Sequence, residues 1–140
     1  MADRIDKITW WLLLAELASE RSEDPWCKVG AVGVREDGSI AGVSYNGAPP
    51  KIDLGTIWTN RDLRRQYVVH AETNLLRYIK PNECPIVATT ISPCYDCLKN
   101  LASYGVKEIY FKEYYDKCDK KELQNMAELF KIDLYQCSSQ

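Results

Sequence analysis

The first apolar pattern of the chain is helical. Residues 3–21 carry apolar side chains at steps of three and four, which is the spacing of one face of an amphipathic helix. The recurring positions are Ile5, Ile8, Trp11 (or Leu12) and Ala15. Asp3 is of a residue type that caps helix N-termini, so we expect the helix to begin there and to end before Pro25.

Two stretches with strand periodicity follow this helix. Residues 28–35 and 39–45 contain many β-branched side chains and alternate apolar with polar positions. Asp37-Gly38 lies between them, and this dipeptide favours the tight turn of a β-hairpin. Residues 47–60 contain prolines and glycines, which favour irregular structure, so we expect a loop there.

Helix and strand patterns alternate in the second half of the chain. We expect helices over residues 71–80, 93–104 and 119–130, and strands over residues 85–91, 106–111 and 132–136. Gly105 follows the second of these helices in the manner of a C-terminal glycine. A hairpin is antiparallel, whereas strands joined through helices can lie parallel. The order therefore predicts an α/β fold around a mixed sheet of five strands.

Composition and charge place the chain among folded globular proteins. Of its 140 residues, 46% are hydrophobic and 27% are charged, and we expect a single domain over residues 1–140. The formal net charge of −2 gives no general attraction for a polyanion, so we expect no nucleic-acid polymer as a partner. The apolar stretch 10–14 is too short to span a bilayer and lacks the layout of a signal peptide. We therefore expect no membrane association and a cytoplasmic location.

One histidine and two cysteines have the spacing of a metal site. His70 is the only histidine, and Cys94 and Cys97 follow Pro93 at the start of an expected helix, which Ser92 could cap. Cysteines three positions apart on a first helical turn point to one side, and the helix N-terminus favours their thiolate form. One imidazole and two thiolates form the ligand set of a catalytic zinc site whose fourth position is left to water.

Glu72 distinguishes this site from a structural one. It stands two residues beyond His70, where a carboxylate can reach the open position of the metal without being a ligand. Two thiolates and a neutral imidazole cancel the charge of Zn²⁺, so the activated water needs a nearby general base. His-Ala-Glu followed by Pro-Cys-x-x-Cys is the signature of zinc-dependent nucleobase deaminases.

Other interpretations of these residues remain open. A lone Cys-x-x-Cys also occurs in structural zinc sites and in redox pairs, but a redox pair gives no role to His70 and Glu72. A closed structural site would need a fourth protein ligand, which another cysteine would have to supply. The other cysteines are Cys27, Cys84, Cys118 and Cys137. We otherwise expect these to be small buried or half-exposed thiols, with Cys84 in the core.

Further motifs resemble those of one family, the deoxycytidylate (dCMP) deaminases, and most closely its short viral and bacterial members. The segments that carry the resemblance are Asp24-Pro25, Lys28–Ala31, Ser44–Gly47, His70–Asn74, Ser92–Cys97, Gly105–Tyr110 and Tyr114–Asp116. They extend from about residue 24 to the end of the chain. Ser44 stands where the family usually has glycine. Free cytidine deaminases usually have cysteine at the position of His70, which argues against that branch.

This resemblance implies a three-layer α/β/α cytidine-deaminase-like fold and the hydrolysis of dCMP to dUMP and ammonia, which supplies dUMP for thymidylate synthesis. Glu72 would move a proton from zinc-activated water to N3 of the base and then help ammonia to leave. The backbone N–H of Ala71 or Glu72 would orient the base carbonyl. Asn46 would contact the sugar hydroxyl, unless it only supports the turn at Gly47.

A 5′-phosphate needs cations at the rim of the pocket. Lys28 adjoins a strand that builds the pocket in relatives, and Arg61 and Arg65 shortly precede His70. We expect at least one of these three cations to hold the phosphate. Arg64 and Arg65 could instead be solvated charges on a helix face. Tyr115, together with Tyr114, could line the pocket or pack at a subunit interface.

The same family is commonly hexameric, activated by dCTP and inhibited by dTTP. Tyr45-Asn46-Gly47 is compatible with such an effector site, with Mg²⁺ accompanying the effector nucleotide, although Ser44 departs from the family pattern. Residues 48–69 contain neither cysteine nor histidine, so we expect a single zinc ion. The resemblance thus implies a homo-oligomer, in the host cytoplasm if the protein is viral.

Two functions of other classes compete with this one. A transfer-RNA adenosine deaminase would share the zinc site but would need a basic rim and a path for a polymer, which the acidic charge balance disfavours. A non-catalytic, zinc-stabilised assembly subunit would leave Glu72 without a purpose.

Overall fold

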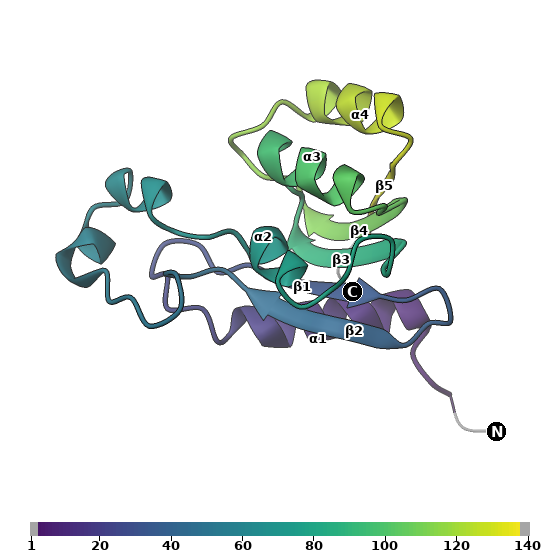
Figure 1. Ribbon diagram of the computed structural model, residues 1–140, viewed down its shortest axis with the longest axis horizontal. Coiled ribbons are helices and arrows are strands. Elements are labelled where there is room, and N and C mark those ends of the chain that lie inside the picture. The colour runs from purple at the N-terminus through teal and green to yellow at the C-terminus, as the bar shows by residue number, and fades with distance from the viewer. Residues whose placement is uncertain (1–2, 138–140) are drawn as a thin grey trace.

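The computed structural model describes residues 3–137 and contains a five-stranded sheet between two layers of helices (Figure 1). The helices are α1 (Lys7–Ser19), α2 (Ala71–Leu76), α3 (Tyr95–Ser103) and α4 (Lys120–Leu129), and two short 3₁₀ helices cover Gly55–Thr59 and Leu63–Gln66. The strands are β1 (Gly30–Val34), β2 (Ile40–Tyr45), β3 (Ile86–Ile91), β4 (Glu108–Glu113) and β5 (Asp133–Gln136). The expected α/β class is confirmed.

The sheet is mixed, as the sequence predicts. Its strand order is β2-β1-β3-β4-β5. The hairpin strands β1 and β2 pair antiparallel, and the turn between them has Gly38 at φ +90°, the left-handed region that favours glycine. β1 also pairs antiparallel with β3, whereas β3, β4 and β5 are parallel to one another. The parallel strands are joined through α3 and α4, which places both helices over the sheet.

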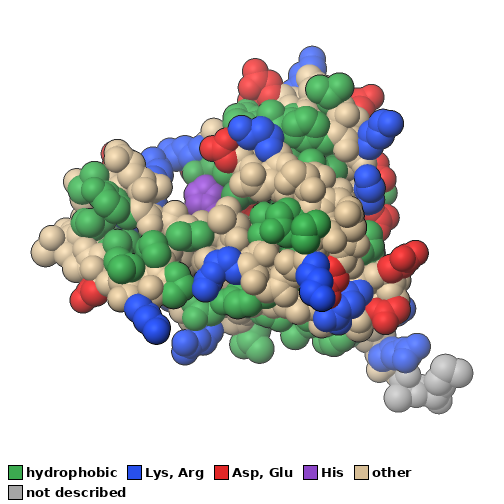
Figure 2. All heavy atoms as spheres, viewed as in Figure 1, with side chains coloured by type: hydrophobic (Ala, Val, Ile, Leu, Met, Phe, Trp, Pro, Cys, Tyr) green, Lys and Arg blue, Asp and Glu red, His purple; other side chains and the backbone are tan. Residues whose placement is uncertain are grey.

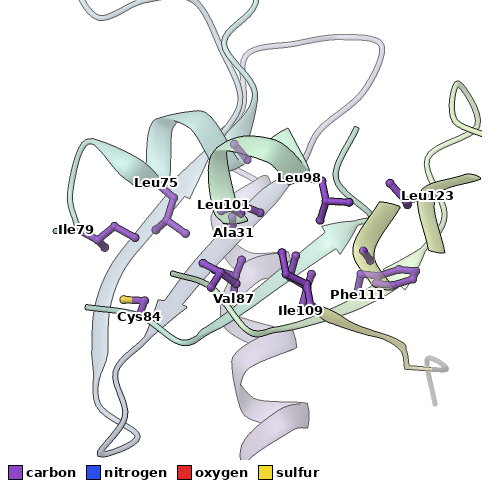
Figure 3. Packing of buried hydrophobic residues seen from close by; sticks show 14 residues of the cluster. Ala31, Leu75, Ile79, Cys84, Val87, Leu98, Leu101, Ile109, Phe111 and Leu123 are labelled. Atoms are coloured by element: carbon purple, nitrogen blue, oxygen red, sulfur yellow. The ribbon is translucent and has the colours of Figure 1, made fainter. Parts of the chain in front are cut away.

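Two apolar layers hold the helices against the two faces of the sheet. On one face, α2, α3 and α4 pack on the strands through side chains that include Leu75, Leu98 and Leu123 (Figure 3). On the other face, α1 packs through Trp11 and Leu12. The three-layer α/β/α arrangement is therefore confirmed (Figure 1). Cys84 is buried in the first layer, as expected.

The first helix begins later than its apolar pattern predicts. Asp6, not Asp3, is its N-cap, and the Asp6 carboxylate accepts a hydrogen bond of 2.7 Å from the backbone N–H of Thr9. Ile5 precedes the helix and is exposed. The prediction failed here because the sequence offers two aspartates three positions apart, and only contacts with the sheet decide which one lies at the start of the buried turns.

The expected helix 71–80 and the expected loop 47–60 also differ from the structure. α2 ends at Leu76, and the following turn directs Ile79 back into the core. Residues 55–59 form a 3₁₀ helix inside the expected loop. Such short i→i+3 turns satisfy backbone groups locally without an apolar period, so the sequence pattern does not reveal them.

Gly30 is required where α1 crosses β1. A Cβ atom at this position would lie 1.8 Å from the backbone carbonyl oxygen of Ala15. We therefore expect Gly30→Ala to lower the free energy of unfolding by about 3 kcal/mol, because backbone atoms cannot yield as a side chain can. Thermal denaturation would measure this loss. Gly47→Ala is the matched control, since its Cβ would meet Glu23 at an ordinary 3.4 Å. Equal stability of the two variants would contradict the prediction.

The described residues include no helix long and apolar enough to cross a membrane. The expected domain bounds also take in residues 1–2 and 138–140, which lie outside the described residues.

Candidate active site

His70, Cys94 and Cys97 converge at the ends of two helices. The imidazole Nδ1 of His70 lies 3.3 Å from the sulfur of Cys97 and 3.5 Å from the sulfur of Cys94. The three donor atoms all lie within 4.8 Å of one another. Bond lengths and tetrahedral angles at zinc separate a nitrogen ligand from a sulfur ligand by about 3.5 Å. The donor types and their spacing therefore fit a zinc ion with three protein ligands.

Cys94 is itself the N-cap of α3. Its sulfur accepts from the backbone N–H of Cys97 at 3.4 Å, so both sulfurs lie on one side of the first turn. Ser92 does not cap this helix as the sequence suggested. The Ser92 hydroxyl instead accepts a hydrogen bond of 2.8 Å from the backbone N–H of Tyr115, which ties β3 to the loop after β4. Pro93 lies before the cap and outside the helix.

The local charges favour a thiolate at Cys94. Its pKa is lowered to about 4, first because the Cys97 thiol donates a hydrogen bond to it, and further because His70 and the backbone N–H of Cys97 stabilise the anion. The pKa of Cys97 is raised because it shares its proton with this neighbouring thiolate and is buried. Hydrogen bonding to Cys94 also raises the pKa of His70. A metal ion that binds here deprotonates both thiols, since it replaces the shared proton with a larger positive charge.

Glu72 is buried beside the three donors. Its side chain lies on the first turn of α2, and it is 4% exposed. Burial raises its pKa to about 7, so this carboxyl group can both accept and return a proton near neutral pH. The structure therefore places a carboxyl group with a pKa near neutrality beside a cluster of three metal-ligand donors.

Contacts from β2 and α3 fix the start of α2. The hydroxyl of Ser44 donates to the backbone carbonyl of Ala71 at 2.6 Å, and the amide of Asn74 donates to the carbonyl of Tyr45 at 2.9 Å. The Thr73 hydroxyl lies 3.8 Å from the sulfur of Cys97. Ser44 is thus a structural contact between β2 and the start of α2, a role its place in the sequence did not indicate, and it lines the second cavity described below.

A cavity of about 340 Å³ opens above these residues. The histidine is visible at the bottom of a hollow, with basic side chains at its edge (Figure 2). The lining comes from the loop before β1, from the segment between β2 and α2, from the zinc motifs and from the loop after β4. It includes Trp26, Cys27, Asn46, Arg61, Arg64, Arg65, His70, Ala71, Glu72, Cys94, Tyr115 and Asp116. This volume is in the range typical of small-molecule sites.

Asn46 lies in the wall of the cavity with its side chain held by backbone groups. Its carbonyl oxygen accepts from Val29 N–H at 2.9 Å, and its amide donates to the carbonyl of Cys27 at 2.8 Å. A carbonyl oxygen has a second lone pair, which can still accept from a ligand hydroxyl. Asn46 therefore supports the loop before β1, and not the turn at Gly47, and it also lines the cavity.

The four cations considered from the sequence are not equivalent. Arg61 and Arg65 line the cavity, and Arg61 lies over the ring of Trp26, 5.9 Å from its centroid. Lys28 is exposed and is not among the residues that line the cavity. Arg64 lines the cavity but is buried and pairs with Asp24 at 3.0 Å, so it is not a solvated charge. Sequence spacing could not reveal this pair, because its partners are 40 residues apart.

The two tyrosines after β4 both line the cavity, but their other contacts differ. Tyr114 packs edge-to-face on Phe111 at 4.8 Å, and its hydroxyl accepts from the amide of Gln124 at 2.8 Å. Tyr115 is half-buried at the cavity, and the positive charge of Arg65 opposes the rise that burial causes in its pKa. Tyr115 is therefore close to the candidate phosphate-binding cation. Cys27 and Asp116 also line the cavity: Cys27 belongs to no motif of the sequence, and Asp116 belongs to the Tyr114–Asp116 motif but was given no role there.

Tyr45 and Gly47 line a second cavity on the outer side of β2, of about 380 Å³. Arg77, Lys51 and Asn74 also line it. This cavity contains basic side chains, and the expected effector residues Tyr45 and Gly47 are brought together there. The third expected effector residue, Asn46, does not line this cavity and lines the first cavity instead.

Comparison with known proteins gives a consistent assignment. Residues 5–113 match the cytidine and deoxycytidylate deaminase zinc-binding region. The chain is 36% identical to a probable deoxycytidylate deaminase of Caenorhabditis elegans over 76% of its length, although the match spans only 57% of that protein. It is 32% identical to the deoxycytidylate deaminase of Mus musculus, over 92% of this chain and 78% of that one. The crystal structure of dCMP deaminase from the cyanophage S-TIM5 in complex with dCMP and dUMP superposes with a TM-score of 0.77 at 27% identity, and the match covers 96% of this chain and all (100%) of that one.

Proposed function

The chain belongs to the cytidine and deoxycytidylate deaminase family, and on this premise we propose that it hydrolyses dCMP to dUMP and ammonia. One observation carries the proposal: the buried Glu72 carboxyl group lies beside the His70, Cys94 and Cys97 donors at the floor of a nucleotide-sized cavity. The relatives named deoxycytidylate deaminase, and the neighbour whose crystal contains dCMP and dUMP, support cytosine as the base.

His70, Cys94 and Cys97 would hold the zinc ion, which supplies Lewis-acid activation of a water molecule when bound. Glu72 would accept a proton from that water as the water oxygen attacks C4 of cytosine, and would donate this proton to N3 of the ring. The Glu72 carboxylate would then take the second water proton, from the new C4 hydroxyl group, and pass it to the amino group, which would leave as ammonia as the C4 carbonyl forms. The pKa of Glu72, raised by burial to about 7, suits both directions of transfer. The position of Glu72 therefore accounts for each proton that the reaction moves.

The remaining contacts orient the nucleotide. The backbone N–H of Ala71 or Glu72, at the start of α2, orients the base carbonyl, and the free lone pair of Asn46 accepts from the sugar hydroxyl. Tyr115 lies where it can contact the base or the phosphate. These assignments rest on the placement of each residue in the cavity wall.

Arg65 is the cation that we expect to hold the 5′-phosphate, with Arg61 beside it. Arg65→Ala should raise the KM for dCMP by about tenfold, since a charge-assisted contact to phosphate contributes about 1.5–3 kcal/mol. The value of kcat should change little, because the contact is made equally in the ground state and the transition state.

Steady-state assays on dCMP and deoxycytidine would test this assignment, with Lys28→Ala as the matched control because Lys28 does not line the cavity. If the ratio of kcat/KM for dCMP to that for deoxycytidine were unchanged in Arg65→Ala and in Arg61→Ala, neither cation would bind the phosphate. A loss in Lys28→Ala alone would transfer the role to that residue.

The proposed activity itself is tested by offering the zinc-loaded protein dCMP, deoxycytidine, dCTP and a transfer RNA. Loss of cytosine absorbance with dCMP alone is the expected result. Inosine in the RNA would instead support an adenosine deaminase, and the lack of turnover with any substrate, with zinc present, would support a non-catalytic subunit. The net charge of −2 favours the free nucleotide over a polymer.

Regulation and assembly are further parts of the proposal. The second cavity, with Tyr45, Gly47 and two basic side chains, suits a nucleotide effector such as dCTP or dTTP with its Mg²⁺. The exposed apolar side chains Trp10, Leu13 and Leu17 along α1 support a homo-oligomer, for which the family suggests a hexamer. Cytoplasmic location, or host cytoplasm for a viral protein, remains a prediction from the sequence.

A further inference from the structure

A buried ion pair stands in the wall of the active-site cavity. Nε of Arg64 lies 3.0 Å from Oδ1 of Asp24, and the two residues are only 6% and 1% exposed. Both line the cavity, but neither belongs to the zinc motifs. Removing two charges from water costs several kcal/mol per ion, so a buried pair is weak evidence for stability alone. The position of the Asp24–Arg64 pair in the cavity wall suggests a role in shaping the cavity.

The Asp24 carboxylate joins three segments of the cavity wall. Oδ1 accepts from the backbone N–H of Trp26 at 2.8 Å and of Cys27 at 3.2 Å, which shapes the turn before β1. Oδ2 lies 3.5 Å from the amide nitrogen of Asn46. Arg64 belongs to the third segment, the 3₁₀ helix Leu63–Gln66. One carboxylate thus connects the turn before β1, the expected sugar contact and the basic rim.

The segment that carries the rim cations needs such a connection. Residues 54–66 contain two short 3₁₀ helices, Gly55–Thr59 and Leu63–Gln66, and project from the sheet (Figure 1). Trp26 also contacts this segment from the turn before β1: its Nε1 donates to the carbonyl of Trp58 at 2.9 Å, and its ring lies under Arg61. Trp26 is 47% exposed, however, whereas Arg64 is only 6% exposed and is the most buried residue of the segment.

Asp24 neutralises Arg64 inside the cavity wall, so Arg64 does not supply the charge of the rim. Arg65 pairs with Asp62 at 3.2 Å, but the Asp62 carboxylate is 87% exposed, and a pair this open to water leaves Arg65 able to bind a phosphate. Arg65 follows Arg64 directly in the chain, and Arg61 precedes Arg64 by one turn. Where Arg64 is fixed, the backbone of its two neighbours is fixed as well.

We propose that the Asp24–Arg64 pair is a positioning device that holds the Arg61–Arg65 rim at the distance where a 5′-phosphate binds, and so sets the preference for a nucleoside monophosphate over a nucleoside. This inference rests on the proposed deamination of dCMP. Asp24 and Arg64 act through the rim and not on the reacting atoms.

The test replaces the pair without leaving an unpaired charge. Asp24→Asn combined with Arg64→Met keeps an oxygen acceptor for Trp26 N–H and a side chain of similar length, and neutral replacements of buried pairs usually fold. We expect the KM for dCMP to rise about tenfold, while kcat for dCMP and kcat/KM for deoxycytidine stay within about threefold. Glu83→Gln combined with Arg35→Met is the control, since this pair at 2.9 Å lies outside the cavity.

Hydrogen exchange gives a readout that does not depend on turnover. Backbone amides of residues 54–67 should exchange faster in the double variant, with no change in α3, because only the rim loses its anchor. Equal losses of kcat/KM for dCMP and deoxycytidine, or unchanged exchange in residues 54–67, would overturn the inference. If the unaltered protein failed to deaminate dCMP, the proposed function would fail by itself, and the exchange data would still decide whether the pair anchors the rim.

Discussion

Glu72→Gln is expected to reduce turnover of dCMP by about 10³–10⁴-fold while leaving one zinc ion per chain. The glutamine amide has nearly the shape of the carboxyl group, so the cavity and the three zinc donors should be undisturbed. It cannot accept a proton from water or return one to N3, however, and His70, Cys94 and Cys97 would be engaged as zinc ligands.

Zinc content by elemental analysis and kcat by loss of cytosine absorbance would be measured on the same preparation. Glu128→Gln is the matched control, because Glu128 is an exposed carboxylate at the end of α4. Turnover within tenfold of the unaltered protein would show that another group moves the proton. Loss of zinc from Glu72→Gln would assign the carboxylate a ligand role that its place outside the three-donor cluster does not suggest.

The core of the site could be predicted from the sequence because its parts are local. Glu72 follows His70 by two residues, and Cys94 and Cys97 share one helical turn, so each pair has its geometry fixed by a short piece of backbone. Only the meeting of the two pieces is a property of the fold. The alternating pattern predicts a mixed sheet but not its strand order, and the pairing of β3 with β1 is seen only in the structure.

The features of the site and fold that the sequence did not predict depend on contacts between residues far apart in the chain. Arg64 has the same local pattern as Arg65, and nothing near it in the chain indicates that it is buried against Asp24. The departure at Ser44 raised a question about the effector motif, and Ser44 does line the second cavity with Tyr45, but only the structure shows that its hydroxyl also bonds to the carbonyl of Ala71. Helix caps failed for a related reason: Asp3 and Ser92 are good capping residues, but packing against the sheet selects Asp6 and Cys94.

Cys97→Ala is expected to lower zinc content below about a tenth of an ion per chain, since loss of a ligand costs more than the 10–100-fold affinity typical of outer-shell changes. Cys97 is almost fully buried, and the remaining two donors leave the ion with little more than water around it. Turnover should fall with the zinc content. Stability should fall as well, because an ion bound only by the folded state stabilises it by about 4 kcal/mol at a thousand times its dissociation constant.

Removing zinc from the unaltered protein separates the effect of metal loss from the effect of the missing Cys97 side chain. Chelation of the unaltered protein should lower its melting temperature and abolish turnover, and added zinc should restore both, whereas Cys97→Ala should not recover. Cys137→Ala serves as the control, because this half-exposed thiol at the end of β5 is outside the cluster. Retention of one zinc ion by Cys97→Ala would mean that another side chain can complete the site. Cys27 would then be the first to test, since it lines the same cavity.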